Sequence, residues 1–321
     1  MPDFVTPFGG SVYSLQSDSC LRSPQMNPRH LAYFVALGLF WGIAPSQYAY
    51  WGKAGVPVSH ILVYTGFGLA VFLAALARWK HGQIGWNHDV LRYSLICAVL
   101  MNVPFSMSLT FARHVPTAEL ALVFSLSPII NFVVGAISGK EPVTPRNLLA
   151  VLLGFAACVT LVLTRQGFAT GEVSWWLFAS FINPVLYAAY NWYANRHWPR
   201  GGTTFSIGAA ESLWTGVLGL PFMLVLAPPW TTTYTAFAYG TIAVATLMWV
   251  AERVSYFTLI RETGPSYTAQ AVYLSAPAAV IFGVIFFGGV GDIWLWASLA
   301  VLMVALYLNN SGKAATKTGA A

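Results

Sequence analysis

The feature that most constrains this chain is a succession of apolar stretches, each about twenty residues long, separated by short polar connections. A helix rises about 1.5 Å per residue, so roughly twenty apolar residues cross the ~30 Å hydrocarbon core of a bilayer. The composition agrees, because 57% of the residues are hydrophobic and only 8% are charged, against about a quarter in soluble domains. The chain therefore needs lipid as its solvent.

Ten such stretches predict an all-α, polytopic membrane protein with ten transmembrane helices. They lie near residues 31–51, 57–78, 90–112, 116–138, 146–164, 173–194, 205–227, 236–259, 264–288 and 292–310. Residues 1–30 are rich in Ser, Pro and Gly and lack the apolar core of a signal peptide, so we expect a disordered cytoplasmic tail there. Residues 311–321 are expected to form a second one. Met26 lies just before the first stretch, and we hypothesise that it is the native start; an endogenous N-terminus upstream of Met26 would exclude this.

The distribution of the sixteen Lys and Arg residues predicts the orientation. They gather in the connections, where basic residues favour the cytoplasmic side, so the net charge of +6 does not indicate nucleic acid binding. With a cytoplasmic N-terminus, twelve lie inside, three lie outside, and Arg253 lies within a span. The inside set is Arg22, Arg29, Arg78, Lys80, Arg92, Lys140, Arg146, Arg196, Arg200, Arg261, Lys313 and Lys317, and the outside set is Lys53, Arg113 and Arg165. Both termini are then cytoplasmic, in the inner membrane of a bacterium.

An internal repeat relates the two halves of the chain. The segment PTAELALVFSLSP at 116–128 aligns without gaps to PSYTAQAVYLSAP at 265–277, and a Pro-x-x-Tyr pattern recurs in the first and sixth stretches. We therefore expect two five-helix repeats, 31–165 and 172–310, around a central cavity. Because five is odd, the second repeat must be inverted, which is typical of secondary transporters. A gene duplication that only enlarged the bundle is the alternative.

Polar and aromatic side chains in mid-span are candidates to line that cavity, because lipid disfavours polar groups and helix faces recur at three- and four-residue spacing. Aromatic rings there could stack on a ligand, although packing within the bundle explains any single ring equally well. The candidates are Trp41, Tyr48, Asn102, Ser106, Tyr187, Asn191, Trp214, Trp249, Tyr256, Gln270 and Tyr273.

Three charged residues within spans are candidates for coupling or gating: Glu211, Glu252 and Arg253. A charge at mid-helix costs roughly 3 kcal/mol on insertion scales, so it calls for a function. Arg253 could pair with a glutamate and latch the cytoplasmic side, or a glutamate could carry a proton in exchange for substrate. Snorkelling of these side chains to the interface is the alternative.

Prolines within spans are candidate hinges, because they interrupt the backbone hydrogen bonds of a helix. The hinge candidates are Pro45, Pro128, Pro184 and Pro277.

Nothing in the sequence indicates an enzyme. The stretch 289–292 has the GxGD pattern of intramembrane aspartyl proteases, but the other aspartates, Asp3, Asp18 and Asp89, lie in a tail or a loop, so a catalytic partner is missing. There is no HExxH and no complete GxxxxGK[ST]. The three cysteines have no CxxC spacing. We therefore expect no cofactor and no metal.

The stretch from Leu109 to Leu163, LTFARHVPTAELALVFSLSPIINFVVGAISGKEPVTPRNLLAVLLGFAACVTLVL, resembles the second part of an EamA domain, the five-helix unit of the drug/metabolite transporter superfamily. Residues 259–308 are similar to the same segment of a second copy. The most specific features are the helix centres Ser127-Pro128 and Ala276-Pro277 and the turn at 139–141, which the second copy replaces with Gly-Asp. In addition, LYAAYNWYANRHWPRG at 186–201 is similar to the YddG-type aromatic amino acid exporters.

The resemblance implies a carrier that exports aromatic and other neutral amino acids by alternating access, with membrane lipid and small molecules as its partners. A cationic-drug exporter is the runner-up, because aromatic cages and a buried glutamate also suit quaternary amines. Nucleotide sugars would call for clustered Arg and Lys at mid-depth, which are missing. A channel or a receptor is the competitor from another class, and counterflow separates it from a carrier. The sequence does not set the oligomeric state, and a monomer is compatible with it.

Overall fold

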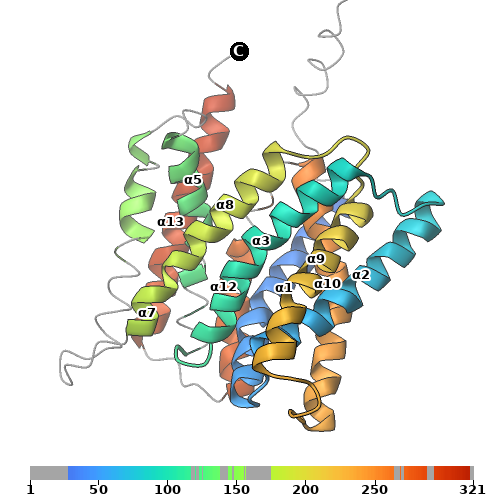
Figure 1. Cartoon of the computed structure of the whole chain (residues 1–321). Coiled ribbons are helices and arrows are strands. Elements are labelled where there is room, and N and C mark those ends of the chain that lie inside the picture. Colours follow the sequence, from blue (N-terminus) through green and yellow to red (C-terminus); the bar gives the residue numbers. More distant parts are fainter. Residues whose placement is uncertain are drawn as a thin grey trace, which may run out of the picture.

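The structure, a computed structural model, describes residues 28–116, 120, 123–124, 126–137, 144–146, 148–154, 156, 175–263, 268, 271–287 and 293–318. Over these residues the chain forms α-helices and connections and contains no strand, so the all-α prediction is confirmed for them (Figure 1). The helices are α1 (Pro28–Lys53), α2 (Val58–His81), α3 (His88–Phe111), α5 (Ser127–Ile137), α7 (Trp175–Ser180), α8 (Ile182–Arg196), α9 (Thr204–Leu226), α10 (Ala236–Glu262), α12 (Val272–Phe287) and α13 (Ile293–Thr318).

Four of the helices in the described part of the chain are long and apolar enough to cross a membrane: α2, α3, α9 and α10. Several of the others are divided or short in the described part of the chain. Helices α7 and α8 divide one predicted span, and α5 and α12 have fewer than eighteen residues within the described ranges. Helix α13 extends to Thr318, into the segment expected to be a tail. Most of the expected N-terminal tail, and parts of the aligned segments 116–128 and 265–277, lie outside the described residues.

Local sequence signals set the helix ends. The side chain of Asn87 accepts a hydrogen bond from the third residue of α3, and Thr235 does the same for α10. Thr203 and Ser206 form a reciprocal capping box at the start of α9. Helix α2 ends at Gly82, whose φ of 72° is a left-handed conformation that favours glycine.

The predicted span 173–194 is broken between α7 and α8. Pro184 has no N–H to bond the carbonyl of Ser180, and its ring clashes with that carbonyl in a regular helix. The chain turns at Phe181, whose N–H bonds the carbonyl of Phe178 three residues back, at 3.1 Å. The first of the two helices is only six residues long.

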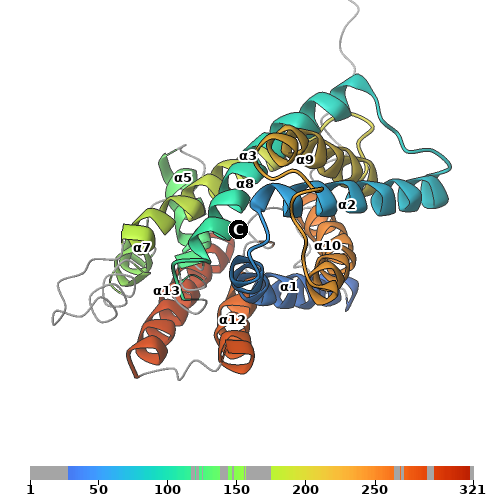
Figure 2. The same cartoon turned by 60° about the horizontal axis from the view of Figure 1, so that its bottom comes forward.

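The helix–helix contacts of the bundle fall into similar pairs (Figures 1 and 2). Helix α2 packs along α9. Helix α1 packs on α12 and α10, while α8 packs on α5 and α3. Helix α9 packs on α3, while α2 packs on α10. The backbones of α2 and α9 touch, because a Cβ atom on Gly66 would lie 2.6 Å from the backbone nitrogen of Gly216.

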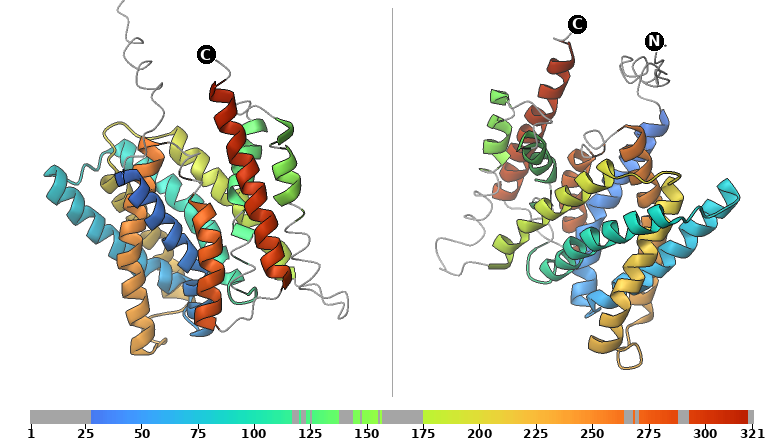
Figure 3. Two further views of the ribbon diagram at one scale, coloured as in Figure 1. Left: turned by 180° about the vertical axis from the view of Figure 1, so that it is seen from behind. Right: turned by 45° about the horizontal axis from the view of Figure 1, so that its top comes forward.

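The start of α1 and the end of α13 lie at the same end of the bundle (Figure 3). At that end, the ring of His30 contacts the carboxylate of Glu262 at 2.8 Å and so joins α1 to α10.

Different contacts join the helices at the start of α2. The buried ring of His60 donates from Nε2 to the carbonyl of Ala227, which can only accept. Its Nδ1 lies 2.9 Å from the hydroxyl of Tyr234, and burial raises the pKa of that hydroxyl, so it stays protonated. Arg113 donates to the carbonyl of Val56 at 2.8 Å. Backbone carbonyls therefore accept two of these three contacts.

Candidate functional site

A cavity of about 180 Å³ lies among α1, α2, α3, α5, α8, α9, α10 and α12. Its aromatic lining is Phe40, Trp41, Tyr48, Phe105, Phe124, Tyr187, Tyr190, Trp249 and Tyr256, and its polar lining includes Thr65, Asn102, Ser127, Asn131, Asn191, Ser212, Thr215, Glu252, Arg253 and Ser275. An apolar cavity of about 150 Å³ holds a benzene molecule, so this one accommodates a ligand with one ring. Its composition differs from a benzene cavity in that polar groups reach it from seven helices.

Part of the wall is a cluster of rings contributed by α1, α3 and α10. The ring of Tyr48 meets Phe105 edge-on at 5.6 Å, and Phe105 meets Trp249 edge-on at 5.4 Å. On the other side, Tyr256 lies 6.3 Å from Trp41 and stacks on Tyr190 at 5.9 Å. Edge-on and offset arrangements are the favoured ones for aromatic pairs, so the wall is held in a defined shape.

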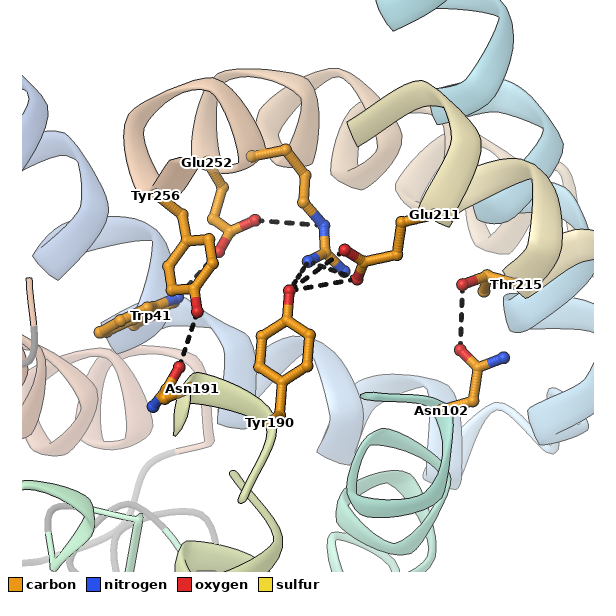
Figure 4. Close-up of polar contacts among 9 residues, drawn as sticks. Trp41, Asn102, Tyr190, Asn191, Glu211, Thr215, Glu252 and Tyr256 are labelled. Carbon is orange, nitrogen blue, oxygen red and sulfur yellow. Dashed lines mark hydrogen bonds and ion pairs between the residues drawn. The ribbon is translucent and has the colours of Figure 1, made fainter. Parts of the chain in front are cut away.

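An ion pair is buried beside this wall. Arg253 Nη1 lies 3.0 Å from Glu211 Oε1, and the two side chains are 13% and 1% exposed. The hydroxyl of Tyr190 donates to both oxygens of Glu211, at 3.2 and 3.1 Å, and accepts from Arg253 Nη1 at 3.4 Å. Figure 4 shows Tyr190 and Glu211 pointing toward each other from α8 and α9. Each partner therefore compensates the loss of water around the others.

The second carboxylate, that of Glu252, has a different environment. Its Oε1 accepts a hydrogen bond from Trp41 Nε1 at 2.9 Å, which joins α10 to α1 (Figure 4). Its Oε2 lies 3.8 Å from Arg253 Nε, which is too long for a hydrogen bond. Glu252 and Arg253 both line the cavity, whereas Glu211 does not. The charged face of the cavity thus consists of two adjacent residues of opposite sign.

Neutral hydrogen bonds connect the remaining helices around the cavity. The hydroxyl of Tyr256 donates to Asn191 Oδ1 at 2.7 Å, and Thr215 donates to Asn102 Oδ1 at 3.0 Å (Figure 4). These bonds join α10 to α8 and α9 to α3. A third group joins α8 to α3, because Ser108 Oγ lies 3.2 Å from the hydroxyl of Tyr187 and accepts from Asn183 at 2.8 Å. Among the described residues, no group of three or more His, Cys, Asp and Glu side chains could hold a metal ion.

The structure brings most of the sequence-predicted site residues together. Those that line the cavity are Trp41, Tyr48, Asn102, Tyr187, Asn191, Trp249, Tyr256, Glu252 and Arg253. Ser106 and Trp214 are absent from the lining, and the indole of Trp214 donates to the carbonyl of Leu91. Gln270 and the side chain of Tyr273 lie outside the described residues.

The four proline candidates differ in their surroundings. Pro45 and Pro277 lie inside α1 and α12, and both helices continue through them. Pro184 accompanies the break before α8. Pro128 is the second residue of α5, and its side chain is outside the described residues. Only Pro184 coincides with an interrupted helix in the described ranges.

Sequence reasoning missed two important residues. Tyr190, which connects both members of the ion pair, lies three residues after Tyr187, so the helical spacing could have found it. Thr215 lies next to Trp214, and the rotation of α9 that turns the tryptophan away turns the threonine toward the cavity. No signal in the sequence fixes that rotation.

Comparison with known proteins supports a membrane carrier. Residues 29–163 match the model of the EamA-like transporter family. A solved structure described as "Crystal structure of protein" is 16% identical and superposes with a TM-score of 0.57, over 88% of this chain and 96% of that one; such low identity shows the fold alone. Among curated proteins, no sequence matches this chain. Over residues 29–163 the chain is therefore similar to the EamA-like transporter family, whose members are transporters of the drug/metabolite type.

Proposed function

We propose that the protein is a secondary transporter that exports aromatic and other neutral amino acids across the bacterial cytoplasmic membrane by alternating access. The observation that carries this proposal is the pair of opposite charges, Glu252 and Arg253, at the wall of an otherwise neutral, aromatic cavity. An amino acid is a zwitterion with an apolar side chain, so it needs one anionic contact, one cationic contact and a dry wall.

The contacts can be assigned to atoms. Glu252 Oε2 has only the weak contact with Arg253, so it can accept from an ammonium group. Arg253 uses Nη1 for Glu211 and Tyr190 and directs Nε toward Glu252, which leaves Nη2 to donate to a carboxylate. The ring cluster of Tyr48, Phe105 and Trp249 then packs against the substrate side chain. A wall of several rings and no further charge suits a broad range of neutral side chains.

The packing pattern supports two inverted repeats. In the proposed repeats, the counterparts are α1 and α8, α2 and α9, α3 and α10, and α5 and α12. Each helix contact can therefore be compared with the contact between the two counterparts. The contact of α1 with α12 then becomes that of α8 with α5, and the contact of α1 with α10 becomes that of α8 with α3. The contact of α3 with α9 becomes that of α10 with α2, while the α2–α9 contact maps onto itself. A pseudo-two-fold relation of this kind lets a carrier open its site to either side.

The chain ends support the proposed topology. The start of α1 and the end of α13 share one end of the bundle, as an even number of crossings requires (Figure 3). The predicted concentration of basic residues on that side supports a cytoplasmic position for both termini. The family match covers 29–163, nearly the range proposed for the first repeat.

Counterflow in proteoliposomes tests the proposal. Vesicles loaded with unlabelled phenylalanine should take up external labelled phenylalanine transiently above equilibrium, because a carrier exchanges substrate across a sealed membrane. Labelled leucine should exchange as well, and labelled glucose should not. A channel would let the label equilibrate without overshoot, and a receptor would give no uptake. Either result, or exchange of a cationic dye with no amino acid exchange, would overturn the assignment.

A further inference from the structure

The charges at the cavity do not balance. Glu211, Glu252 and Arg253 come together at its edge, two acidic and one basic, so the ionised cluster has a net charge of −1. Among the described residues that line the cavity, the other polar side chains are amides, hydroxyls and indoles, which carry no charge to neutralise it. A residual charge in a low-dielectric interior is costly unless a cation joins it or a carboxylate takes up a proton.

Arg253 is already neutralised by Glu211. The two atoms of that pair are 3.0 Å apart, against 3.8 Å for the contact of Arg253 with Glu252. Tyr190 bonds both members, which fixes the pair in place. Glu211 is 1% exposed and lies outside the lining, so no ligand reaches it in this conformation. The positive charge of Arg253 is therefore largely compensated before any substrate arrives.

When all three groups are ionised, Glu252 carries the remaining negative charge. Its only hydrogen bond in the described structure comes from Trp41, a neutral donor, and its side chain is 14% exposed. It lines the cavity, so a ligand can approach it from that side.

The rings near Glu252 suit an organic cation. Trp41 donates directly to the carboxylate, and Tyr256, one turn further along α10, lies 6.3 Å from the Trp41 ring. Indole and phenol faces attract ammonium groups, and the attraction strengthens where water is excluded. A carboxylate beside two such rings therefore suits an alkylammonium.

We infer that the cavity selects its substrates through their ammonium group, held by Glu252, and that a substrate carboxylate is dispensable. The inference rests on the proposed function in one respect, namely that this cavity carries the substrate. The predicted substrate class is then wider than amino acids: it includes aromatic and apolar primary amines and amino acid esters. A singly charged amine brings the cluster to zero net charge, whereas a zwitterion leaves it at −1.

Binding of four matched probes to the purified full-length chain tests this inference. The probes share one phenyl ring and a similar length: phenylalanine, phenethylamine, 3-phenylpropionate and N-acetylphenethylamine. Isothermal titration calorimetry at constant pH and ionic strength gives each dissociation constant. Phenethylamine should bind at least as tightly as phenylalanine, whereas the anion and the neutral amide should bind at least one hundredfold more weakly. The neutral amide makes the test independent of any mutation.

A pair of variants then assigns the effect to one residue. Glu252→Gln should weaken phenethylamine binding at least tenfold, while Glu252→Asp retains the charge and should keep measurable binding. Glu262→Gln is the matched control, because this glutamate lies on the same helix, is 40% exposed, and contacts His30 rather than the cavity. It should leave binding unchanged.

Each outcome separates the inference from the proposed function. Binding of phenylalanine without phenethylamine overturns the inference, because Arg253 then recognises the carboxylate, and leaves the amino acid exporter intact. Binding of phenethylamine without phenylalanine supports the inference and overturns the exporter assignment. Binding of neither overturns both. Full phenethylamine binding by folded Glu252→Gln shows that another group holds the ammonium and overturns the inference.

Discussion

The ion pair between Arg253 and Glu211 gives the sharpest prediction, because its two partners can be removed separately and together. Glu211→Gln keeps the shape and still accepts from Tyr190, so it removes little besides the charge. Breaking a buried pair from one side costs about 3–5 kcal/mol. We expect the lower end, since Glu252 remains 3.8 Å from Arg253 Nε as a substitute partner.

Arg253→Met should cost more. It leaves Glu211, 1% exposed, with only the hydroxyl of Tyr190 as a partner, so we expect the upper end of the same range, about 5 kcal/mol. The double variant Glu211→Gln/Arg253→Met has neither buried charge of the pair. Its loss should therefore be no larger than that of Arg253→Met alone, well below the sum of the two single losses, because contacting residues are energetically coupled.

Thermal unfolding in one detergent measures all four proteins of this cycle. At about 2 °C per kcal/mol, the single variants should lower the apparent Tm by about 6 °C and about 10 °C. Glu262→Gln serves as the control and should shift it by no more than about 2 °C, because exposed pairs contribute at most about 1 kcal/mol. If the stability losses of the two single variants simply add in the double variant, Arg253 and Glu211 do not stabilise each other. The argument that Glu211 neutralises Arg253, on which the ammonium site depends, would then be refuted.

Three further predictions concern the helix packing. Gly66→Ala should destabilise the protein by about 1–3 kcal/mol, because the new methyl group would lie 2.6 Å from the backbone of α9. Gly240→Ala has open space around it and should stabilise the protein by up to about 1 kcal/mol. Tm shifts of the same sign in the two variants would contradict the close contact of α2 with α9. Tyr234→Phe leaves a nitrogen of the buried ring of His60 without its partner and should cost about 1–3 kcal/mol, visible as a lower Tm. Pro184→Ala restores the missing N–H at the α7–α8 break and should slow counterflow several-fold with phenylalanine binding unchanged; unaltered exchange rates would rule out a hinge there.

The sequence predicts helices better than it predicts where they end. The apolar stretch marked at 57–78 becomes a helix that continues to His81, because Arg78 and the residues after it keep the helical conformation until Gly82 caps it. Hydropathy indicates which residues lie in lipid, whereas the capping residue, here Gly82, determines where the helix ends. The break at Phe181 was also invisible to hydropathy, although Pro184 marked its neighbourhood.

For the candidate site as well, the sequence predicted the positions of some residues and not of others. Polar groups in mid-span predicted the cavity wall for Asn102 and Glu252, because lipid penalises both. The rotation of each helix about its axis is set by packing with residues far away in the sequence, so Trp214 was expected in the cavity and instead bonds Leu91. Likewise, charge alone could not predict that Glu211 would lie behind Arg253 rather than beside the cavity.

The contact between His30 and Glu262 makes one end of the bundle sensitive to the solution around it. Beside it, Arg29 lies 4.0 Å from the same carboxylate, the two side chains are 55% and 40% exposed, and attraction between exposed charges is screened within about 8 Å at physiological salt. The ring of His60 is buried, and its Nε2 bonds a backbone carbonyl, an uncharged group whose hydrogen bond depends little on salt. Rising ionic strength should therefore weaken the attraction between α1 and α10 at this end of the bundle more than it weakens the contacts around His60.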